Sequence, residues 1–265
     1  MNIQLLGAEG GVEARHPLTT TFLINGETAI DAGSIASALS FEDQLKIQSV
    51  VITHSHWDHI RDLPFLAINR FGTLAPPVQA PPIHLYGGDQ VLTALQNHLF
   101  NDLIWPDCTR RPDPSRPSLT LHPMEAGKDL SIGPLTITPI PVNHSFQAFG
   151  YIVSEKGGAG KKSGIVISGD TGPTEELWKA ANQIEHLKAV FLELSFPKAH
   201  ASAAIQSRHI STASLSNEIQ KIKKNIPIFA YHLKPPFHEG IEKELKELGL
   251  EKRVKIAKSG DTFEF

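Results

Sequence analysis

Four side chains that can bind a metal ion lie within a span of six residues, in the order His-x-His-x-Asp-His. They are His54, His56, Asp58 and His59, and they follow an apolar run over residues 49–52 that predicts a buried strand ending in a tight loop. Imidazole and carboxylate groups are ligands that Zn²⁺ accepts. Such a loop can direct the first two histidines to one point and the Asp-His pair to a neighbouring one. The motif therefore favours two adjacent metal ions over one, with a solvated histidine-rich turn as the alternative interpretation.

Three further candidate ligands, His144, Asp170 and His232, each follow an apolar run. Open α/β folds place ligands at the carboxyl ends of their strands, so these side chains are expected at one edge of a sheet. A single histidine after a strand is usually an ordinary loop residue, but three candidate ligands that each follow an apolar run favour a metal site. The runs that precede them are predicted strands over residues 135–143, 164–169 and 227–231.

The remaining elements must position these ligands in an alternation of strands and helices. Apolar patterning and glycine turns predict short strands over residues 2–7, 20–24, 28–30 and 83–86. Apolar residues at helical spacing predict helices over residues 62–69 and 89–100, a helix opened by Pro173, another after Ser211, and a last one over 239–248.

The metal motif and the strand-end residues together resemble the metallo-β-lactamase-fold hydrolases. The resemblance implies an α/β fold, an αβ/βα four-layer sandwich, in a single catalytic domain over residues 1–265. It also implies two divalent metal ions, Zn²⁺ first, with Mn²⁺ or Fe²⁺ as alternatives. By the family pattern, one ion is held by His54, His56 and His144, the other by Asp58, His59 and His232, and Asp170 bridges them. Asp31, in an Asp-x-Gly turn, is expected to support the ligands from behind.

A glutamate and a histidine narrow the reaction class. Glu193 lies on the apolar strand 189–197, and His209 comes directly before the helix that follows Ser211. This pair resembles the phosphodiesterase branch of the superfamily, in which the histidine contacts the phosphate and protonates the leaving oxygen. A helix start attracts an oxyanion, and a paired glutamate would favour the protonated imidazole. We assign catalytic roles to His209, Glu193 and Asp58, the last by orienting the nucleophile. A helix-capping or surface histidine is the alternative for His209.

Several other stretches resemble one subfamily, the class II 3′,5′-cyclic-nucleotide phosphodiesterases. They cover residues 6–11, 30–34, 101–107, 169–173 and 193–197, and Ile210 stands where the pattern has leucine. The resemblance implies hydrolysis of cyclic AMP or cyclic GMP to nucleoside 5′-monophosphates by metal-bound hydroxide. A tRNase Z-like RNA phosphodiesterase and a non-catalytic nucleotide-binding sensor remain alternatives. The loop over residues 101–117 is expected to act as a substrate lid or as a subunit contact in a homodimer.

Composition limits the partners. The 265-residue chain is 40% hydrophobic and 20% charged, with a net charge of −3 and no basic tail, so stable binding to nucleic acid or to an anionic membrane is not favoured. A single cysteine, Cys108, rules out an intramolecular disulfide. The first predicted strand begins next to Met1, which leaves no room for a signal peptide, and a cytoplasmic enzyme is the expectation.

Overall fold

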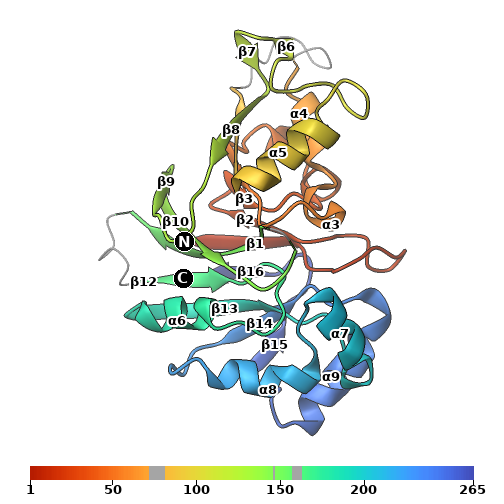
Figure 1. Ribbon diagram of the computed structural model, residues 1–265, viewed down its shortest axis with the longest axis vertical. Helices are drawn as coiled ribbons and strands as arrows, with labels where there is room; N and C mark the ends of the chain where they lie inside the picture. Colours follow the sequence, from red (N-terminus) through yellow and green to blue (C-terminus); the bar gives the residue numbers. More distant parts are fainter. Residues whose placement is uncertain (72–80, 146, 157–162) are drawn as a thin grey trace. The chain divides into compact units, whose positions relative to one another are not determined.

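The computed structural model describes residues 1–71, 81–145, 147–156 and 163–265. Within these residues the strands form two seven-stranded sheets and a two-stranded ribbon (Figure 1). The chain divides into two compact units, each built around one of the large sheets. Unit 1 comprises Met1–Gly7, Leu18–Met124 and Gly260–Glu264, and unit 2 comprises Ala8–Pro17, Glu125–Ser259 and Phe265. The assignment of both units to one catalytic domain stays a prediction.

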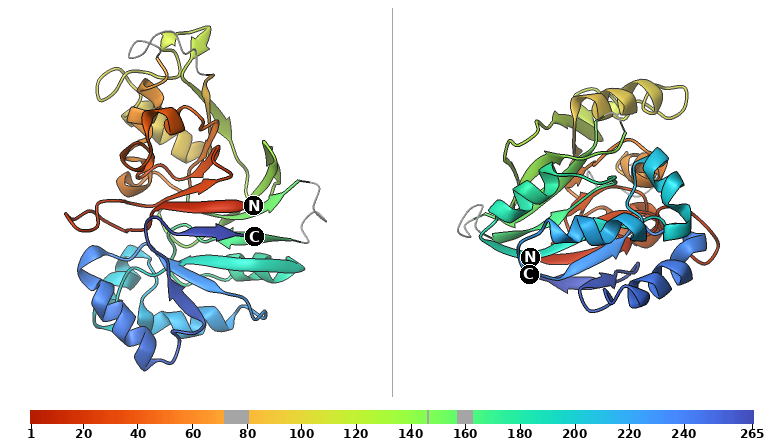
Figure 2. Two further views of the ribbon diagram at one scale, coloured as in Figure 1. Left: turned by 180° about the vertical axis from the view of Figure 1, so that it is seen from behind. Right: turned by 60° about the horizontal axis from the view of Figure 1, so that its bottom comes forward.

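The sheet of unit 1 has the strand order β16-β1-β2-β3-β4-β5-β8. Strands β3, β4, β5 and β8 run parallel, whereas β16, β1 and β2 pair antiparallel. The first and last strands of the chain lie side by side in both views of Figure 2. The bounds are β1 (Asn2–Gly7), β2 (Thr21–Ile24), β3 (Thr28–Ile30), β4 (Ser49–Val51), β5 (Ile83–Gly87), β8 (Leu119–Pro123) and β16 (Thr262–Glu264), and the ribbon joins β6 (Pro112–Asp113) to β7 (Arg116–Pro117).

Helices of unit 1 pack on its sheet through leucine-rich faces. Leu66, Leu92 and Leu95 share a buried core with Val50 and Leu85 from the central strands. Burial of this apolar area is the main stabilising contribution to the unit. The helices are α1 (Ile35–Ala38), α2 (Phe41–Gln44), α3 (Trp57–Ile60), α4 (Leu63–Ile68) and α5 (Asp89–His98).

The sheet of unit 2 has the order β15-β14-β13-β12-β11-β10-β9. Strands β12 to β15 run parallel, while β9, β10 and β11 form antiparallel pairs. The strands are β9 (Leu130–Ile132), β10 (Leu135–Pro141), β11 (Phe149–Glu155), β12 (Ser163–Ile167), β13 (His186–Glu193), β14 (Ile228–Tyr231) and β15 (Val254–Ile256). The helices are α6 (Glu176–Gln183), α7 (Ala201–Ser207), α8 (Thr212–Gln220) and α9 (His238–Glu247), with short 3₁₀ turns η2 (Lys198–His200) and η3 (Pro235–Phe237).

One predicted helix starts later than expected. The sequence predicts that Pro173 opens α6, but the helix begins at Glu176. The carbonyl of Pro173 accepts a hydrogen bond from Asn143 Nδ2, and the backbone N–H of Thr174 donates to Glu218 Oε2. These side chains hold the residues before Glu176 in a loop, so the prediction was wrong by one turn.

Two further observations concern the cysteine and the helices of the chain. Burial raises the pKa of the Cys108 thiol to about 12, so this cysteine is not a nucleophile at neutral pH. None of the helices in the described part of the chain is long and apolar enough to cross a bilayer. The cytoplasmic location stays a prediction.

Candidate metal centre

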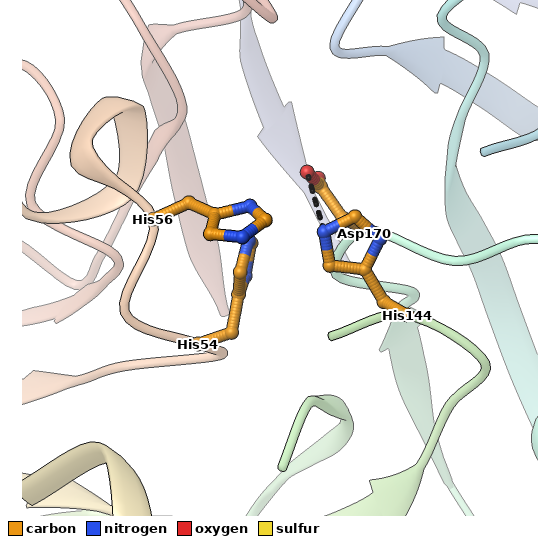
Figure 3. Close-up of side chains that lie close together, drawn as sticks. All are labelled: His54, His56, His144 and Asp170. Carbon is orange, nitrogen blue, oxygen red and sulfur yellow. Dashed lines mark ion pairs between the residues drawn. The ribbon is translucent and has the colours of Figure 1, made fainter. Parts of the chain in front are cut away.

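The histidine motif of unit 1 spans the loop after β4 and the first residues of α3. His56 is the residue before α3, and Asp58 and His59 lie within that short helix. The ring of His54 lies 4.5 Å from that of His56, edge-on at 73° (Figure 3). It lies 4.2 Å from the ring of His59. His54 and His59 are buried, whereas His56 is exposed. The structure therefore brings the four residues of the motif into one turn of unit 1.

Asp31 supports this turn from the end of the neighbouring strand β3. Its carboxylate accepts hydrogen bonds from the Thr53 backbone N–H at 2.8 Å and from His59 Nδ1 at 2.7 Å. The Thr53 hydroxyl also donates to Asp31, so its oxygen is left to accept from His54 Nδ1 at 3.1 Å. Both buried histidines thus carry their proton on Nδ1, and Nε2 keeps its lone pair. Asp31 lies behind the ligands, as the Asp-x-Gly turn predicts.

Three candidate ligands of unit 2 lie at the carboxyl ends of strands. Asp170 follows β12, His232 follows β14, and His144 follows β10, which runs in the same direction. Asp170 Oδ2 is 3.3 Å from His232 Nε2 and 3.9 Å from His144 Nε2, the pair joined by the dashed line in Figure 3. All three side chains are buried. The strand direction thus brings together residues that are far apart in sequence.

Groups behind these histidines hold their Nδ1 atoms in hydrogen bonds. His144 Nδ1 donates to the carbonyl of Arg208 at 3.0 Å. The Ser195 hydroxyl donates to Glu193 Oε2 at 3.0 Å, so its oxygen can accept from His232 Nδ1, also at 3.0 Å. The carbonyl partner fixes the proton of His144 on Nδ1, and Nε2 of both His144 and His232 lies within 4 Å of Asp170 Oδ2. Strain is also present, because His232 has a φ of +62°, a conformation uncommon outside glycine.

The donor atoms fit divalent metal ions of the zinc class. Four buried histidines, two in each unit, each have Nδ1 in a hydrogen bond with a protein group. A hydrogen-bonded second nitrogen is the usual arrangement of metal-binding imidazoles. Each unit also supplies carboxylate oxygens, from Asp58 and Asp170. The joining of the two sets into one dinuclear centre stays a prediction.

Glu193 and His209 form a buried pair beside the ligands of unit 2. Glu193 ends β13 and accepts a hydrogen bond from His209 Nδ1 at 2.8 Å. The ring of His209 lies 4.9 Å from His144 and 5.5 Å from His232. Burial lowers the pKa of His209, but the charge of Glu193 and its hydrogen bond outweigh burial and leave the pKa above its ordinary value. His209 is therefore suited to hold a proton near the candidate metal ligands.

His209 could also be a ligand itself. Asp170, His209 and His232 each offer one donor atom, and these atoms all lie within 4.8 Å of one another. Because Nδ1 of His209 is bound to Glu193, only Nε2 would remain for a metal ion. Metal content of a His209 variant separates the two roles.

Two supporting residues were missed by the sequence analysis. Ser195 contacts Glu193, His209 and His232 through one hydroxyl group. Arg208, in a left-handed conformation with a φ of +54°, holds His144 through its carbonyl and donates from its guanidinium to the His144 carbonyl. These contacts join segments that are distant in the sequence. A serine or an arginine by itself does not predict which distant segment it will meet. Ser195 lies in the stretch 193–197 that resembles the cyclic-nucleotide phosphodiesterases, but the sequence alone indicated no role for it.

Gly10 leaves the space that His232 occupies. A Cβ atom at residue 10 would lie 2.6 Å from the His232 carbonyl oxygen and 2.7 Å from its ring, closer than real contacts allow. At Gly11 a Cβ atom would meet only the Pro235 ring, at an ordinary 3.4 Å. The segment that bears Gly10 thus forms one wall of the His232 position.

We expect Gly10→Ala to lower the free energy of unfolding by about 1–3 kcal/mol, because the extra methyl overpacks this wall. Gly11→Ala is the matched control and should change stability by about 0.5 kcal/mol or less. Urea unfolding of chelator-treated protein measures both without a contribution from metal. Equal stability of the two variants would contradict the close packing of Gly10 on His232.

The loop over residues 101–117 is ordered by its own polar contacts. Asp102 pairs with Arg111 at 2.9 Å and Asp107 with Arg110 at 2.7 Å. A cavity of about 380 Å³ opens beside it, lined by Phe71, Asp102, Leu103, Ile104, Trp105, Pro106 and Arg111. Leu103 is 89% exposed and Ile104 65%. Its role as a lid or as a subunit contact stays a prediction.

Comparison with known proteins identifies the family. The beta-lactamase superfamily domain matches residues 29–225, well over half of the chain. The chain belongs to this family. Unliganded yeast PDE1 superposes with a TM-score of 0.80 at 21% identity, over 100% of this chain and 99% of that one. The metallo-β-lactamase fold protein YhfI from Bacillus subtilis gives 0.75 at 18% identity, over 99% of each chain. The predicted metallo-β-lactamase fold, an αβ/βα sandwich, is therefore confirmed.

Sequence relatives are named as phosphodiesterases. The 3′,5′-cyclic-nucleotide phosphodiesterase 1 of Saccharomyces cerevisiae is 26% identical over 66% of this chain, a match that spans about half (51%) of that enzyme's length. A probable 3′,5′-cyclic-nucleotide phosphodiesterase of Yersinia pestis is 22% identical over 89% of this chain and 78% of its own. Ribonucleases BN and Z match over less than half of this chain. The protein is thus a metallo-β-lactamase-fold hydrolase with cyclic-nucleotide phosphodiesterase homologues.

Proposed function

We propose that this hydrolase cleaves 3′,5′-cyclic mononucleotides, with cyclic AMP and cyclic GMP as first candidates, to nucleoside 5′-monophosphates. The reaction breaks the bond from phosphorus to the 3′-oxygen, and the departing oxygen takes up a proton. The observation that carries the proposal is the buried Glu193–His209 pair beside Asp170 and His232. The departing 3′-oxygen is an alkoxide, which needs a proton in the transition state, and His209 would supply it.

We further propose that the seven predicted ligands hold two metal ions, Zn²⁺ first, with Asp170 between them. When bound, two such ions generate a nucleophile at neutral pH and stabilise the attacking and leaving oxygens. The ligands are His54, His56, Asp58, His59, His144, Asp170 and His232.

Residues of the chain supply the remaining tasks. His209 would donate its proton to the 3′-oxygen, and Glu193 keeps the ring oriented and protonated through the 2.8 Å hydrogen bond to Nδ1. Asp58, with a side chain that is 26% exposed, would orient an attacking water. Ser195 links Glu193 to His232, so the proton donor and a ligand share one support. The proposed substrate is a small molecule, so the protein needs no nucleic-acid-binding surface. A homodimer is compatible with the proposal.

An RNA phosphodiesterase of the tRNase Z kind is the second candidate. The ribonuclease relatives favour it, but the net charge of −3 does not. A nucleotide-binding sensor that holds metal without turnover is the third.

One panel of assays separates the three. The metal-loaded protein is given cyclic AMP, cyclic GMP, pyrimidine cyclic nucleotides, bis(p-nitrophenyl) phosphate and a precursor tRNA, and metal content is measured on the same sample. We expect hydrolysis of the cyclic purine nucleotides to 5′-monophosphates, and its loss in chelator. Cleavage of the tRNA alone would favour the second candidate. Binding of cyclic nucleotide without turnover by the metal-loaded protein would favour the third.

A further inference from the structure

A second group of metal-competent side chains lies in unit 2, apart from the predicted ligands. It consists of Glu9, His16 and His238, whose donor atoms all lie within 4.8 Å of one another. Glu9 Oε2 is 2.6 Å from His238 Nε2, and Glu9 Oε1 is 3.3 Å from His16 Nδ1. The two imidazole rings stack with centroids 4.4 Å apart. We propose that these three residues bind a further divalent transition-metal ion of the zinc class.

The donor set and its spacing suit such an ion. Two imidazoles and one carboxylate form a known zinc ligand set, with solvent in the fourth position. Ligands about 2.0–2.2 Å from a tetrahedral ion lie about 3.4 Å from one another, so small side-chain shifts would suffice. Glu9 is 5% exposed, whereas the side chains of His16 and His238 are 34% and 25% exposed. The carboxylate is therefore buried while the imidazoles leave a path to solvent.

The three residues come from two parts of the chain that the ion would tie together. Glu9 forms a parallel bridge with Leu233, next to a hydrogen bond from Gly10 N to Leu233 O at 3.0 Å. His16 closes a turn with Glu13, and His238 is the first residue of α9. An ion here would fasten residues 8–17 to the start of α9. The same segment carries Gly10, which packs against His232.

A plain hydrogen-bonded cluster is the competing interpretation. The start of α9 disfavours a cation near His238, because the helix dipole is positive at that end. The buried carboxylate of Glu9 opposes this effect at a distance of 2.6 Å. Direct measurement of metal content decides between the two interpretations.

The test compares zinc per chain in the wild type, the double variant His16→Asn/His238→Asn and the single variant Glu9→Gln. His186→Asn is the matched control, because His186 also lies beside a glutamate, Glu185, at 3.5 Å, but belongs to none of the metal-competent groups in the described residues. Each protein is equilibrated with zinc, freed of excess metal and subjected to elemental analysis. We expect the wild type and the control to hold about one more ion per chain than the double variant or Glu9→Gln.

Two more measurements keep the test decisive. Zinc should raise the melting temperature less in the double variant and in Glu9→Gln than in the control, because one stabilising ion is lost. Cobalt titration should likewise saturate at about one equivalent less. Equal zinc content in all four proteins would overturn the proposal. If the double variant does not fold, the near-isosteric Glu9→Gln decides alone. These readouts do not depend on the substrate, so they stand whether or not cyclic nucleotides are hydrolysed.

Discussion

Replacement of His209 by alanine is expected to lower turnover on a cyclic nucleotide by about 10²–10⁴-fold while metal content is unchanged. The loss should be much smaller with bis(p-nitrophenyl) phosphate, because nitrophenolate leaves without a proton and the 3′-alkoxide does not. Steady-state kinetics and elemental analysis on the same preparation measure both quantities. His200→Ala, which removes an exposed histidine of unit 2, is the control.

The outcomes of this experiment assign the role of His209. Equal losses on the two substrates would make it a phosphate-positioning residue. Loss of a metal ion would make it a ligand, as its place beside Asp170 and His232 allows. Full activity on both substrates would mean that His209 has only a structural role, as a residue that precedes α8.

The pH profile tests the partner of His209. The charge and hydrogen bond of Glu193 hold the pKa of His209 above its ordinary value despite burial, so the acid form persists to higher pH and is lost as pH rises through the folded pKa. Activity on a cyclic nucleotide should fall along that limb. Glu193→Gln should move the limb to lower pH and leave it present, an effect that a merely structural role would not produce.

A second large effect is expected for Asp170→Ala. The variant should lose activity and at least one metal ion per chain, because Asp170 lies within 4 Å of both His144 Nε2 and His232 Nε2. The fold should persist, because Asp170 lies in the loop after β12 and is not part of the apolar core. Elemental analysis and circular dichroism measure the two quantities.

Asp129→Ala is the control for this variant. It removes an exposed carboxylate of unit 2 that accepts a hydrogen bond from Thr138 at 2.6 Å. Its metal content should equal that of the wild type. Full metal occupancy in Asp170→Ala would refute the bridging role.

Sequence reasoning named the candidate ligands and one supporting residue, Asp31, but missed two others. His54, His56, Asp58 and His59 are readable because their spacing alone places them in one turn. Ser195 and Arg208 were not readable, since their contacts arise from the pairing of β12, β13 and β14 and from a left-handed residue. The start of α6 was misplaced for a related reason: Asn143 and Glu218, distant in sequence, hold the residues that precede it.

The interleaving of the two units in the chain has a consequence for synthesis. Residues Ala8–Pro17 belong to unit 2, while Gly260–Glu264 return to unit 1 as the edge strand beside β1. On the ribosome, β1 therefore keeps one unpaired edge until residues 262–264 have been synthesised, and such edges invite misassociation. For the same reason, neither unit can be produced as one contiguous fragment. A circularly permuted gene that joins residues 260–264 to residue 1 would let unit 1 form its outer strands early.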